Sequence, residues 1–339
     1  MAKGGDHLDM EAIIARATSV SPLAPGGTMA DYVADLHRHG QSGLLSSDPG
    51  AGWTPDRRFA LFRFPIEHTK PPDPEEVREA LRQGGAWVVS YTLAPGPDRP
   101  PNCMDYVCRD RKYDIDRLAP PVRRNIRRGL RSFTVRLCTW DELAEKGYPA
   151  RADTAIRHGY AKPPEDDTRG FVDRYRGSPH FDIWGAWDGD ELMAWIGVIK
   201  IDNWAYVHQA QSRSAALPLR PNNAVLYLAT RHIMVVEKRD WVTYGVSSIQ
   251  RRDPHLGLHN YKTRMGYVTE PLHRAFAVRR ALRLLLKPAP AAWAWERLAK
   301  LLPWSHAVAR IAGMAGLLSG RELAPLDWAE EAQNDAEDD

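Results

Sequence analysis

The sequence predicts an α/β (α+β) fold built on a mixed, largely antiparallel sheet that is flanked by helices. Three consecutive segments are rich in β-branched and aromatic residues and are joined by short turns typical of an antiparallel meander: residues 183–187, 192–201 and 204–211. Residues 222–239 then change to helical spacing, and residues 241–246 return to the strand pattern. A strand that comes back to a sheet through a helix lies parallel to its neighbour, so the predicted sheet is mixed.

The residues before this meander predict further strands and helices. In chain order they are a strand at 59–64, a helix at 74–83, strands at 86–93 and 102–109, an arginine-rich helix within 118–136 and helical segments across 140–176. Residues 1–52 mix glycine, serine, proline and charges, and we expect a poorly ordered extension there.

The net charge of +3 is distributed unevenly along the 339 residues. Residues 109–136 hold ten Arg or Lys against three Asp, whereas the chain from Asp327 onward is acidic. Such local basicity indicates either an anionic, phosphate-rich partner or a solvated helix face, and the sequence leaves both interpretations open.

The C-terminal residues 275–339 begin with arginines and continue with a Trp- and Leu-rich stretch. Pro288, Pro290 and Pro303 divide this stretch into amphipathic pieces that are too short to span a bilayer. We expect these pieces either to contact an anionic membrane from its surface or to pack back onto the domain.

Cysteine usage and the N-terminus indicate the compartment. Cys103, Cys108 and Cys138 are odd in number and form no C-x-x-C pair, which argues against a disulfide framework or a zinc site and for a reducing compartment. The N-terminus is polar and charged, and no uninterrupted apolar stretch of about 18 residues occurs. We therefore expect a cytoplasmic protein with no metal site and no tightly bound cofactor.

Two motifs occur in a recognisable order. The first is Arg-x-x-Ile-x-x-Gly in the arginine-rich helix, at Arg123, Ile126 and Gly129. The second is Tyr-Lys-Thr-Arg-Met-Gly at residues 261–266, where a short helix precedes the next strand. Together they resemble the Fem-type peptidyltransferases and their relatives in the GNAT acyltransferase superfamily, which carry a similar helix upstream and an aromatic-Lys-x-x-aromatic-Gly ending.

The resemblance implies a GNAT-like fold. It implies a truncated first half at residues 53–150, an acyltransferase half at 151–274 and an additional C-terminal region at 275–339. Where such a sheet changes from antiparallel to parallel, adjacent strands can splay and leave a cleft beside a helix N-terminus. Residues 212–223 lack the Arg/Gln-x-x-Gly-x-Gly/Ala pyrophosphate loop of acetyl-CoA-binding GNAT enzymes. Fem-type enzymes lack this loop too.

Lys262 and Tyr261 are the first catalytic candidates. They match the Phe-Lys pair that the resemblance places at the acyl-transfer centre of Fem-type enzymes. A fixed ammonium there would stabilise a developing oxyanion or a departing hydroxyl, while the ring packs the cleft. The alternative is that Lys262 solvates a helix near its C-terminus.

Tyr206 and His208 are the second pair of candidates. The period of two in residues 204–211 places both side chains on one face of the strand. His208 would serve as a general base near neutral pH and Tyr206 as a hydroxyl donor. The alternative is that both are half-buried sheet residues with local hydrogen bonds.

Polar residues around the predicted cleft are candidates for holding the acyl donor. Four-residue spacing gathers arginines on one side of their helix, where they would hold the phosphates of a CoA or a tRNA unless they form a solubilising face. Ser247 and Ser248 follow a strand and would contact donor or acceptor unless they only form a turn. The full set of candidate donor contacts is Arg123, Arg124, Arg127, Arg128, Asn222, Asn223, Ser247 and Ser248.

Three functions follow from these observations. The leading one is an N-acyltransferase that moves an acyl group from a thioester, acyl-CoA, to an amine of a small-molecule or cell-envelope acceptor. The second changes the donor to an aminoacyl-tRNA, with tRNA as the only nucleic-acid partner and no DNA. The third is a non-catalytic scaffold on a membrane surface.

Overall fold

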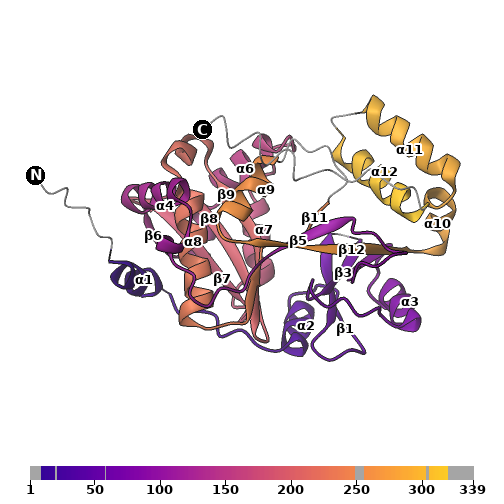
Figure 1. The fold of residues 1–339 in the computed structure, drawn as a ribbon, viewed down its shortest axis with the longest axis horizontal. Helices are drawn as coiled ribbons and strands as arrows, with labels where there is room; N and C mark the ends of the chain where they lie inside the picture. The colour runs from indigo at the N-terminus through magenta and orange to yellow at the C-terminus, as the bar shows by residue number, and fades with distance from the viewer. Residues whose placement is uncertain (1–8, 20, 58, 249–255, 303–304, 320–339) are drawn as a thin grey trace, which may run out of the picture. The chain divides into compact units, whose positions relative to one another are not determined.

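The computed structural model describes residues 9–19, 21–57, 59–248, 256–302 and 305–319 (Figure 1). The chain divides into two compact units, each assembled from segments that are far apart in sequence. Unit 1 takes Met1–Gly27, Val107–Gly245 and Tyr261–Val268, and unit 2 takes Thr28–Tyr106, Val246–Asn260 and Thr269–Asp339. The units alternate along the chain, so they do not follow the consecutive domains expected with boundaries at residues 52, 150 and 274.

Unit 1 is built on the predicted mixed sheet. Its strands are β6 (Thr134–Leu137), β7 (Phe181–Asp188), β8 (Glu191–Ile201), β9 (Trp204–Ser212) and β10 (Trp241–Thr243). They lie in the order β10-β9-β8-β7-β6, and the end of β5 (Cys103–Cys108) pairs with the other side of β10. Only β10 and β9 pair in parallel, and the other pairs are antiparallel. The prediction of a mixed, largely antiparallel sheet is therefore confirmed.

Helices cover both faces of this sheet, which explains why β7 and β8 are buried almost throughout. On one face α8 (Pro221–Arg231) packs on the strands and against α4 (Pro120–Ser132) (Figure 1). On this face the ring of Trp184 lies 5.5 Å from that of His232. Trp195 points to the other face, where its ring lies 5.8 Å from that of Phe171 in α7 (Asp167–Tyr175).

The remaining unit 1 helices are short. They are α1 (Met10–Thr18), η1 (Ile115–Arg117), α5 (Trp140–Lys146), α6 (Tyr148–Arg157) and η2 (Ser214–Leu219). The helix predicted at 222–239 is shorter than expected, because α8 ends at Arg231 and continues only as one π-helical turn, His232–Val236. The strand predicted at 241–246 ends at Thr243, because Gly245 turns the backbone with φ +80°.

A buried ion network fastens the N-terminal segment to unit 1. The side chain of Lys200 is fully buried, and its Nζ lies 2.5 Å from Asp182 and bonds Glu237 as well. The same Nζ donates to the carbonyl of Ala24 at 3.1 Å, and the Ala24 N–H donates to Asp182 at 2.7 Å. Arg239 bonds Glu237 at 2.6 Å and completes the network.

The strands of unit 2 pair in the order β1-β2-β3-β4-β12. Its strands are β1 (Leu44–Leu45), β2 (Gly52–Arg57), β3 (Ala60–Phe64), β4 (Val88–Leu93) and β12 (Val268–Val278). β3 and β4 are parallel and are joined through α3 (Pro74–Gln83), which packs on them. Trp53, Leu61, Ala80, Ala86 and Val89 form the core between helix and sheet.

The expectation of a poorly ordered stretch at 1–52 is corrected for residues 9–19 and 21–52. Helix α2 (Met29–Arg38) begins with a capping box between Thr28 and Asp31 and buries Tyr32 and Leu36. The segment is polar overall, but α2 carries a few apolar side chains at helical spacing. Burial of these side chains stabilises the helix.

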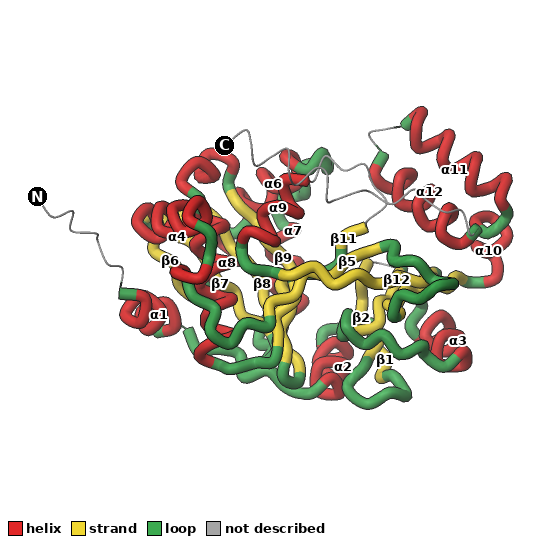
Figure 2. The backbone as a smooth tube through the Cα atoms, in the orientation of Figure 1, coloured by secondary structure: helices red, strands yellow, loops and turns green. Residues whose placement is uncertain are grey.

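Three helices follow β12 in unit 2: α10 (Arg280–Leu286), α11 (Ala289–Leu301) and α12 (His306–Leu318). The break between α10 and α11 falls at Pro288, as predicted. Pro290 lies in the first turn of α11 and does not divide it, and Pro303 lies outside the described residues. Figure 2 shows α11 and α12 as neighbouring helices, and a small core of Leu286, Ala292 and Ala315 joins the three. Within the described residues, no helix combines the length and apolarity that a membrane span requires.

Candidate functional site

The parallel strands β9 and β10 of unit 1 pair over a short ladder and then separate. β9 pairs with β10 only from Trp204/Trp241 to Tyr206/Thr243, whereas its ladder with β8 continues to Ser212. Beyond Thr243, the chain of β10 turns away at Gly245. The strands thus separate at the position where the sheet changes from antiparallel to parallel, as expected.

Lys262 lies beside this separation, on α9 (Leu256–Arg264). Its side chain is buried, with 3% of the residue exposed. The amino group donates to the carbonyl oxygen of Tyr244 at 3.3 Å and lies 4.7 Å from the centre of the Tyr244 ring. Lys262 therefore does not solvate the end of its helix. It is held against the backbone and ring of the residue that follows β10.

Tyr261 packs on the other side of the same helix turn. Its hydroxyl donates to the backbone carbonyl of Asn222 at 3.0 Å, which joins α9 to the first turn of α8. Burial, together with the nearby hydroxyls of Tyr244 and Tyr267, raises the pKa of Tyr261 well above its ordinary value. This phenol therefore stays protonated at neutral pH and acts as a hydrogen-bond donor.

The two asparagines at the start of α8 are engaged within the protein. Asn222 Nδ2 donates to Ser212 Oγ at 3.1 Å, and Asn223 Nδ2 contacts the Met265 sulfur at 3.4 Å. Asn222 Oδ1 is buried and has no hydrogen-bond partner among the described residues. The asparagines thus connect the end of β9 and the end of α9 to the head of α8.

Tyr206 and His208 are adjacent on β9, with ring centroids 5.7 Å apart. The ring of Tyr206 lies under Gly245, since a Cβ built there would be 3.1 Å from the ring. His208 is the extra residue of a β-bulge between the Val198/Val207 and Gly197/Gln209 pairs. Its ring contacts Phe181 at 5.7 Å and Tyr175 at 6.2 Å, so an aromatic cluster borders the imidazole.

The arginines of α4 divide into two rows with different surroundings. Arg127 pairs with Asp116 at 3.2 Å and Arg123 approaches the same carboxylate at 4.0 Å. Arg124 and Arg128 are exposed on the surface of unit 1. The four residues expected to act as one band therefore form a row held by η1 and a row that faces solvent.

The Ile and Gly of the upstream motif are packing residues. Ile126 is fully buried, and Gly129 allows α4 to approach the start of α8. A Cβ at Gly129 would lie 2.5 Å from the carbonyl oxygen of Arg220 and 2.8 Å from Ala224 Cβ. The motif therefore sets the distance between two helices that flank the site.

Ser247 and Ser248 lie in unit 2. They form β11 (Ser247–Ser248), which pairs with Met104 and Cys103 of β5. Their backbone thus has a structural role in unit 2.

The sequence interpretation missed Tyr244 and Gly245. It placed both in the strand predicted at 241–246 and gave them no role. A glycine that follows a short buried strand could have indicated this turn, because glycine adopts positive φ easily. In the described part of the chain, no cluster of three or more His, Cys, Asp or Glu could hold a metal ion.

No family model matches this sequence, and no curated protein sequence matches it either. Among solved structures, the crystal structure of FemX aligns with a TM-score of 0.52 and 10% identity, over 83% of this chain and 98% of FemX. The chain has the fold of FemX. The resemblance of residues 123–129 and 261–266 to Fem-type proteins of the GNAT superfamily predicted this fold, and the FemX match confirms it.

Two further solved structures align with lower TM-scores. The C-terminal domain of a putative lysylphosphatidylglycerol synthetase from Agrobacterium fabrum has a TM-score of 0.45 and 12% identity, over 81% of this chain and 95% of that domain. A tandem GNAT protein from the clavulanic acid biosynthesis pathway has a TM-score of 0.40 and 13% identity, over 79% of this chain and 93% of that protein. The FemX match establishes the fold, and a fold alone does not specify a reaction.

Proposed function

We propose that the protein is an N-acyltransferase whose reaction centre lies in unit 1, where β9 and β10 separate. The observation that carries the proposal is the buried amino group of Lys262, held at 3.3 Å by the Tyr244 carbonyl. Burying a cation costs several kcal/mol unless its surroundings compensate. A positive charge held where two strands separate can stabilise a transition state in which negative charge develops.

The reaction follows from these groups. The nitrogen of the acceptor amine attacks the acyl carbonyl carbon, and a C–N bond forms as the carbonyl oxygen becomes an oxyanion. The ammonium of Lys262 stabilises that oxyanion in a site shielded from water. The bond to the leaving sulfur or oxygen then breaks, and the amine proton must be removed for the amide to form.

His208 is the proposed proton acceptor. The ring of Tyr206 lies between the Gly245 turn and His208, with 5.7 Å between the Tyr206 and His208 centroids. Tyr206 would donate a hydrogen bond to the substrate, and His208 would take the amine proton directly or through one water molecule.

The proposed donor is an acyl thioester such as acyl-CoA, and the proposed acceptor is an amine of a small-molecule or cell-envelope compound. An extended donor would enter between β9 and β10, with its phosphates toward the start of α8, where helix N–H groups favour anions. α8 begins at Pro221 without a side-chain cap, so an anion would have little competition there.

A second donor, aminoacyl-tRNA, is favoured by two specific observations. Residues 214–219 form a 3₁₀ helix that contains Pro218 and precedes α8, in place of a glycine-rich phosphate loop. The exposed row of Arg124 and Arg128 on α4 offers charges spaced for a nucleic-acid backbone. With this donor the leaving group is a ribose hydroxyl instead of a thiol.

Thermal-shift screening or native mass spectrometry against CoA, acyl-CoAs and aminoacyl-tRNA tests the proposal. A donor should bind to the wild-type protein, and transfer of its acyl group to an amine should depend on Lys262. Binding of CoA alone would support the thioester donor, and binding of only charged tRNA would support the second donor. A protein that binds neither class and transfers no acyl group would contradict the proposed function.

A further inference from the structure

The C-terminal helices of unit 2 leave large apolar side chains exposed. Leu284 and Leu285 on α10 are 76% and 59% exposed, and Leu301 and Trp293 on α11 are 71% and 48% exposed. The small core of these helices is filled by other residues, among them Leu286. The exposed side chains are therefore not needed to close that core. Covering them with another apolar phase would remove them from water and lower the free energy of the system.

Two of the exposed side chains lie on the same side of α11. Trp293, Arg297 and Leu301 recur every four residues along one side of α11, and the Arg297 guanidinium lies 4.2 Å from the centre of the Trp293 ring. The indole nitrogen of Trp295 donates to the carbonyl of Leu285 at 3.3 Å, which places the end of α10 beside α11. The exposed leucines of α10 therefore adjoin the helix that carries Trp293.

The charged residues of α10, α11 and α12 are mostly basic. Residues 279–318 contain seven Arg or Lys and a single Glu. That Glu296 is paired with Lys300 at 3.0 Å. A helix face with tryptophan and leucine between basic residues is typical of segments that lie in the interface of an anionic membrane. The same charge opposes self-association through this face.

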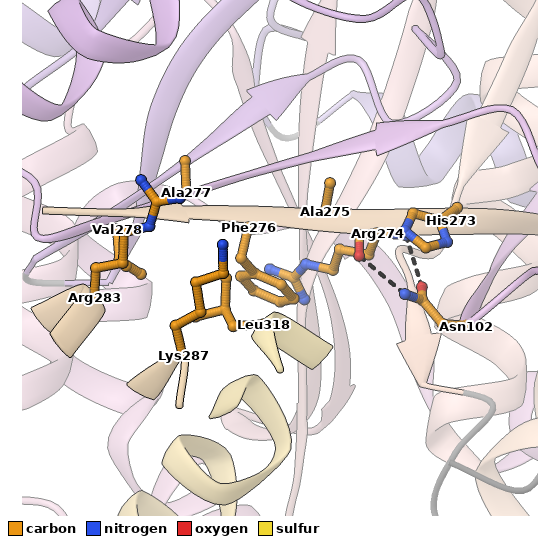
Figure 3. Close-up of a pocket in the computed structure, with 10 residues that line it drawn as sticks. All are labelled: Asn102, His273, Arg274, Ala275, Phe276, Ala277, Val278, Arg283, Lys287 and Leu318. Atoms are coloured by element: carbon orange, nitrogen blue, oxygen red, sulfur yellow. Dashed lines mark hydrogen bonds between the residues drawn. The ribbon is translucent and has the colours of Figure 1, made fainter. Parts of the chain in front are cut away.

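Unit 2 contains a cavity that residues of β12 and α10 line (Figure 3). Its volume is about 440 Å³, and the described residues that line it include Arg274, Arg283 and Lys287 but no Asp or Glu. Asn102 bonds the backbone of Arg274 at 2.7 and 3.0 Å, and the Arg274 guanidinium donates to Ser90 at 3.0 Å and to Asp56 at 3.4 Å. Arg283 lies in α10, which also carries the exposed leucines, and Lys287 is the C-cap residue of that helix. Because Asp56 already pairs with Arg274, Arg283 and Lys287 are the cations that would hold a phosphate group in this cavity.

We propose that α10 and α11 bind the surface of a membrane that contains anionic phospholipid. The exposed leucines and Trp293 enter the acyl-chain boundary, and the cavity lined by Arg283 and Lys287 receives a headgroup phosphate. This interaction is independent of the acyl donor and of the reaction at Lys262.

Sedimentation with vesicles tests the proposal. The full chain should sediment with vesicles of phosphatidylcholine and phosphatidylglycerol and much less with phosphatidylcholine alone. The double variant Leu284→Gln/Leu301→Gln should bind at least about tenfold more weakly, because two leucines lose their apolar burial. Ile156→Gln is the matched control, since Ile156 is 54% exposed on α6 of unit 1, and it should bind like the wild type.

A pair of charge variants distinguishes binding through the headgroup cavity from nonspecific electrostatic attraction to the vesicle. Arg283→Gln/Lys287→Gln should weaken vesicle binding about fivefold for each charge removed, and more than Lys162→Gln/Arg174→Gln, which removes two exposed charges from unit 1. Melting curves of all variants check that each one is folded.

Three outcomes would overturn the proposal. The first is equal binding to neutral and anionic vesicles, and the second is unchanged binding by both the leucine and the charge variants. The third is a protein that binds glycerol phosphate or forms a dimer through the leucines, yet never sediments with anionic vesicles.

Discussion

The amino group of Lys262 lies 3.3 Å from the carbonyl oxygen of Tyr244 and 4.7 Å from the centre of its ring. Tyr244 directly precedes Gly245, whose positive φ turns the chain away from β9. The position of the cation therefore depends on the turn that ends β10. A residue in one helix and a turn in another part of the chain together define the proposed reaction centre.

Lys262→Met should abolish most of the transfer activity. The substitution removes the charge while nearly preserving the volume, so we expect a rate loss on the order of 10²–10³ with little change in melting temperature. Lys112→Met, on the exposed surface of unit 1, is the control and should retain activity. A fully active Lys262→Met protein would refute the assigned role.

The two arginine rows of α4 should respond differently if tRNA is the donor. Arg124→Gln/Arg128→Gln should lower the slope of log affinity against log salt by about two, because each phosphate contact contributes nearly one unit. Arg123→Gln/Arg127→Gln removes the same charge from the row that faces Asp116 and should change the slope less. Equal slopes for both double variants and the wild type would identify α4 as a solubilising face.

Two glycine substitutions should change stability in opposite directions. Gly129→Ala places a Cβ 2.5 Å from a backbone oxygen of Arg220 and should cost about 1–3 kcal/mol in unfolding free energy. Gly170→Ala, in α7, meets no atom within 4 Å and should stabilise the protein by about 0.5–1 kcal/mol through helix propensity. Denaturant unfolding measures both, and a stabilised Gly129→Ala variant would contradict the close helix contact.

Lowering the pH should reduce the unfolding free energy of unit 1, because Glu237 becomes protonated. Hydrogen bonds and charges from His232, Lys200 and Arg239 outweigh burial and lower the pKa of Glu237 from 4.5 to about 2. A lowered pKa in the folded state means that the stabilisation is complete above pH 4.5 and is lost as the pH falls toward 2. Glu237→Gln should lose roughly 3 kcal/mol at neutral pH and show a shallower fall in stability on acidification. Chemical unfolding at a series of pH values checks this, and parallel curves for variant and wild type would exclude the linkage.

The cysteines should react slowly in the folded protein. Burial raises the pKa of Cys103 to about 12 and that of Cys108 to about 11, and Cys138 is buried as well. Because only the thiolate is nucleophilic, labelling by a thiol reagent near pH 8 should be far slower than in denaturant. Mass spectrometry after timed labelling measures the rates. Fast native labelling of any of the three would contradict their burial.

Some elements could be predicted from local sequence alone. Helix α3 has the bounds predicted for it. Asp73 caps it by accepting a hydrogen bond from the N–H of Glu75, and Pro74 occupies its first position. The strands β7, β8 and β9 lie within two residues of their predicted ends, since dense β-branched and aromatic residues and short turns specify them locally. Their order also predicted the mixed sheet and, with the two motifs, the fold confirmed by FemX.

Tertiary structure decided the rest. The pairing of β12 with β4, the fastening of Ala24 by Lys200 and the contact of Lys262 with Tyr244 each join residues that no local period connects. Even the α4 arginines, evenly spaced in sequence, separate into two rows because Asp116 lies beside only one of them. Spacing along the chain determines which side of a helix or strand a residue occupies. Which partner it meets there depends on burial and charge pairing between distant segments, and those interactions exist only in the folded chain.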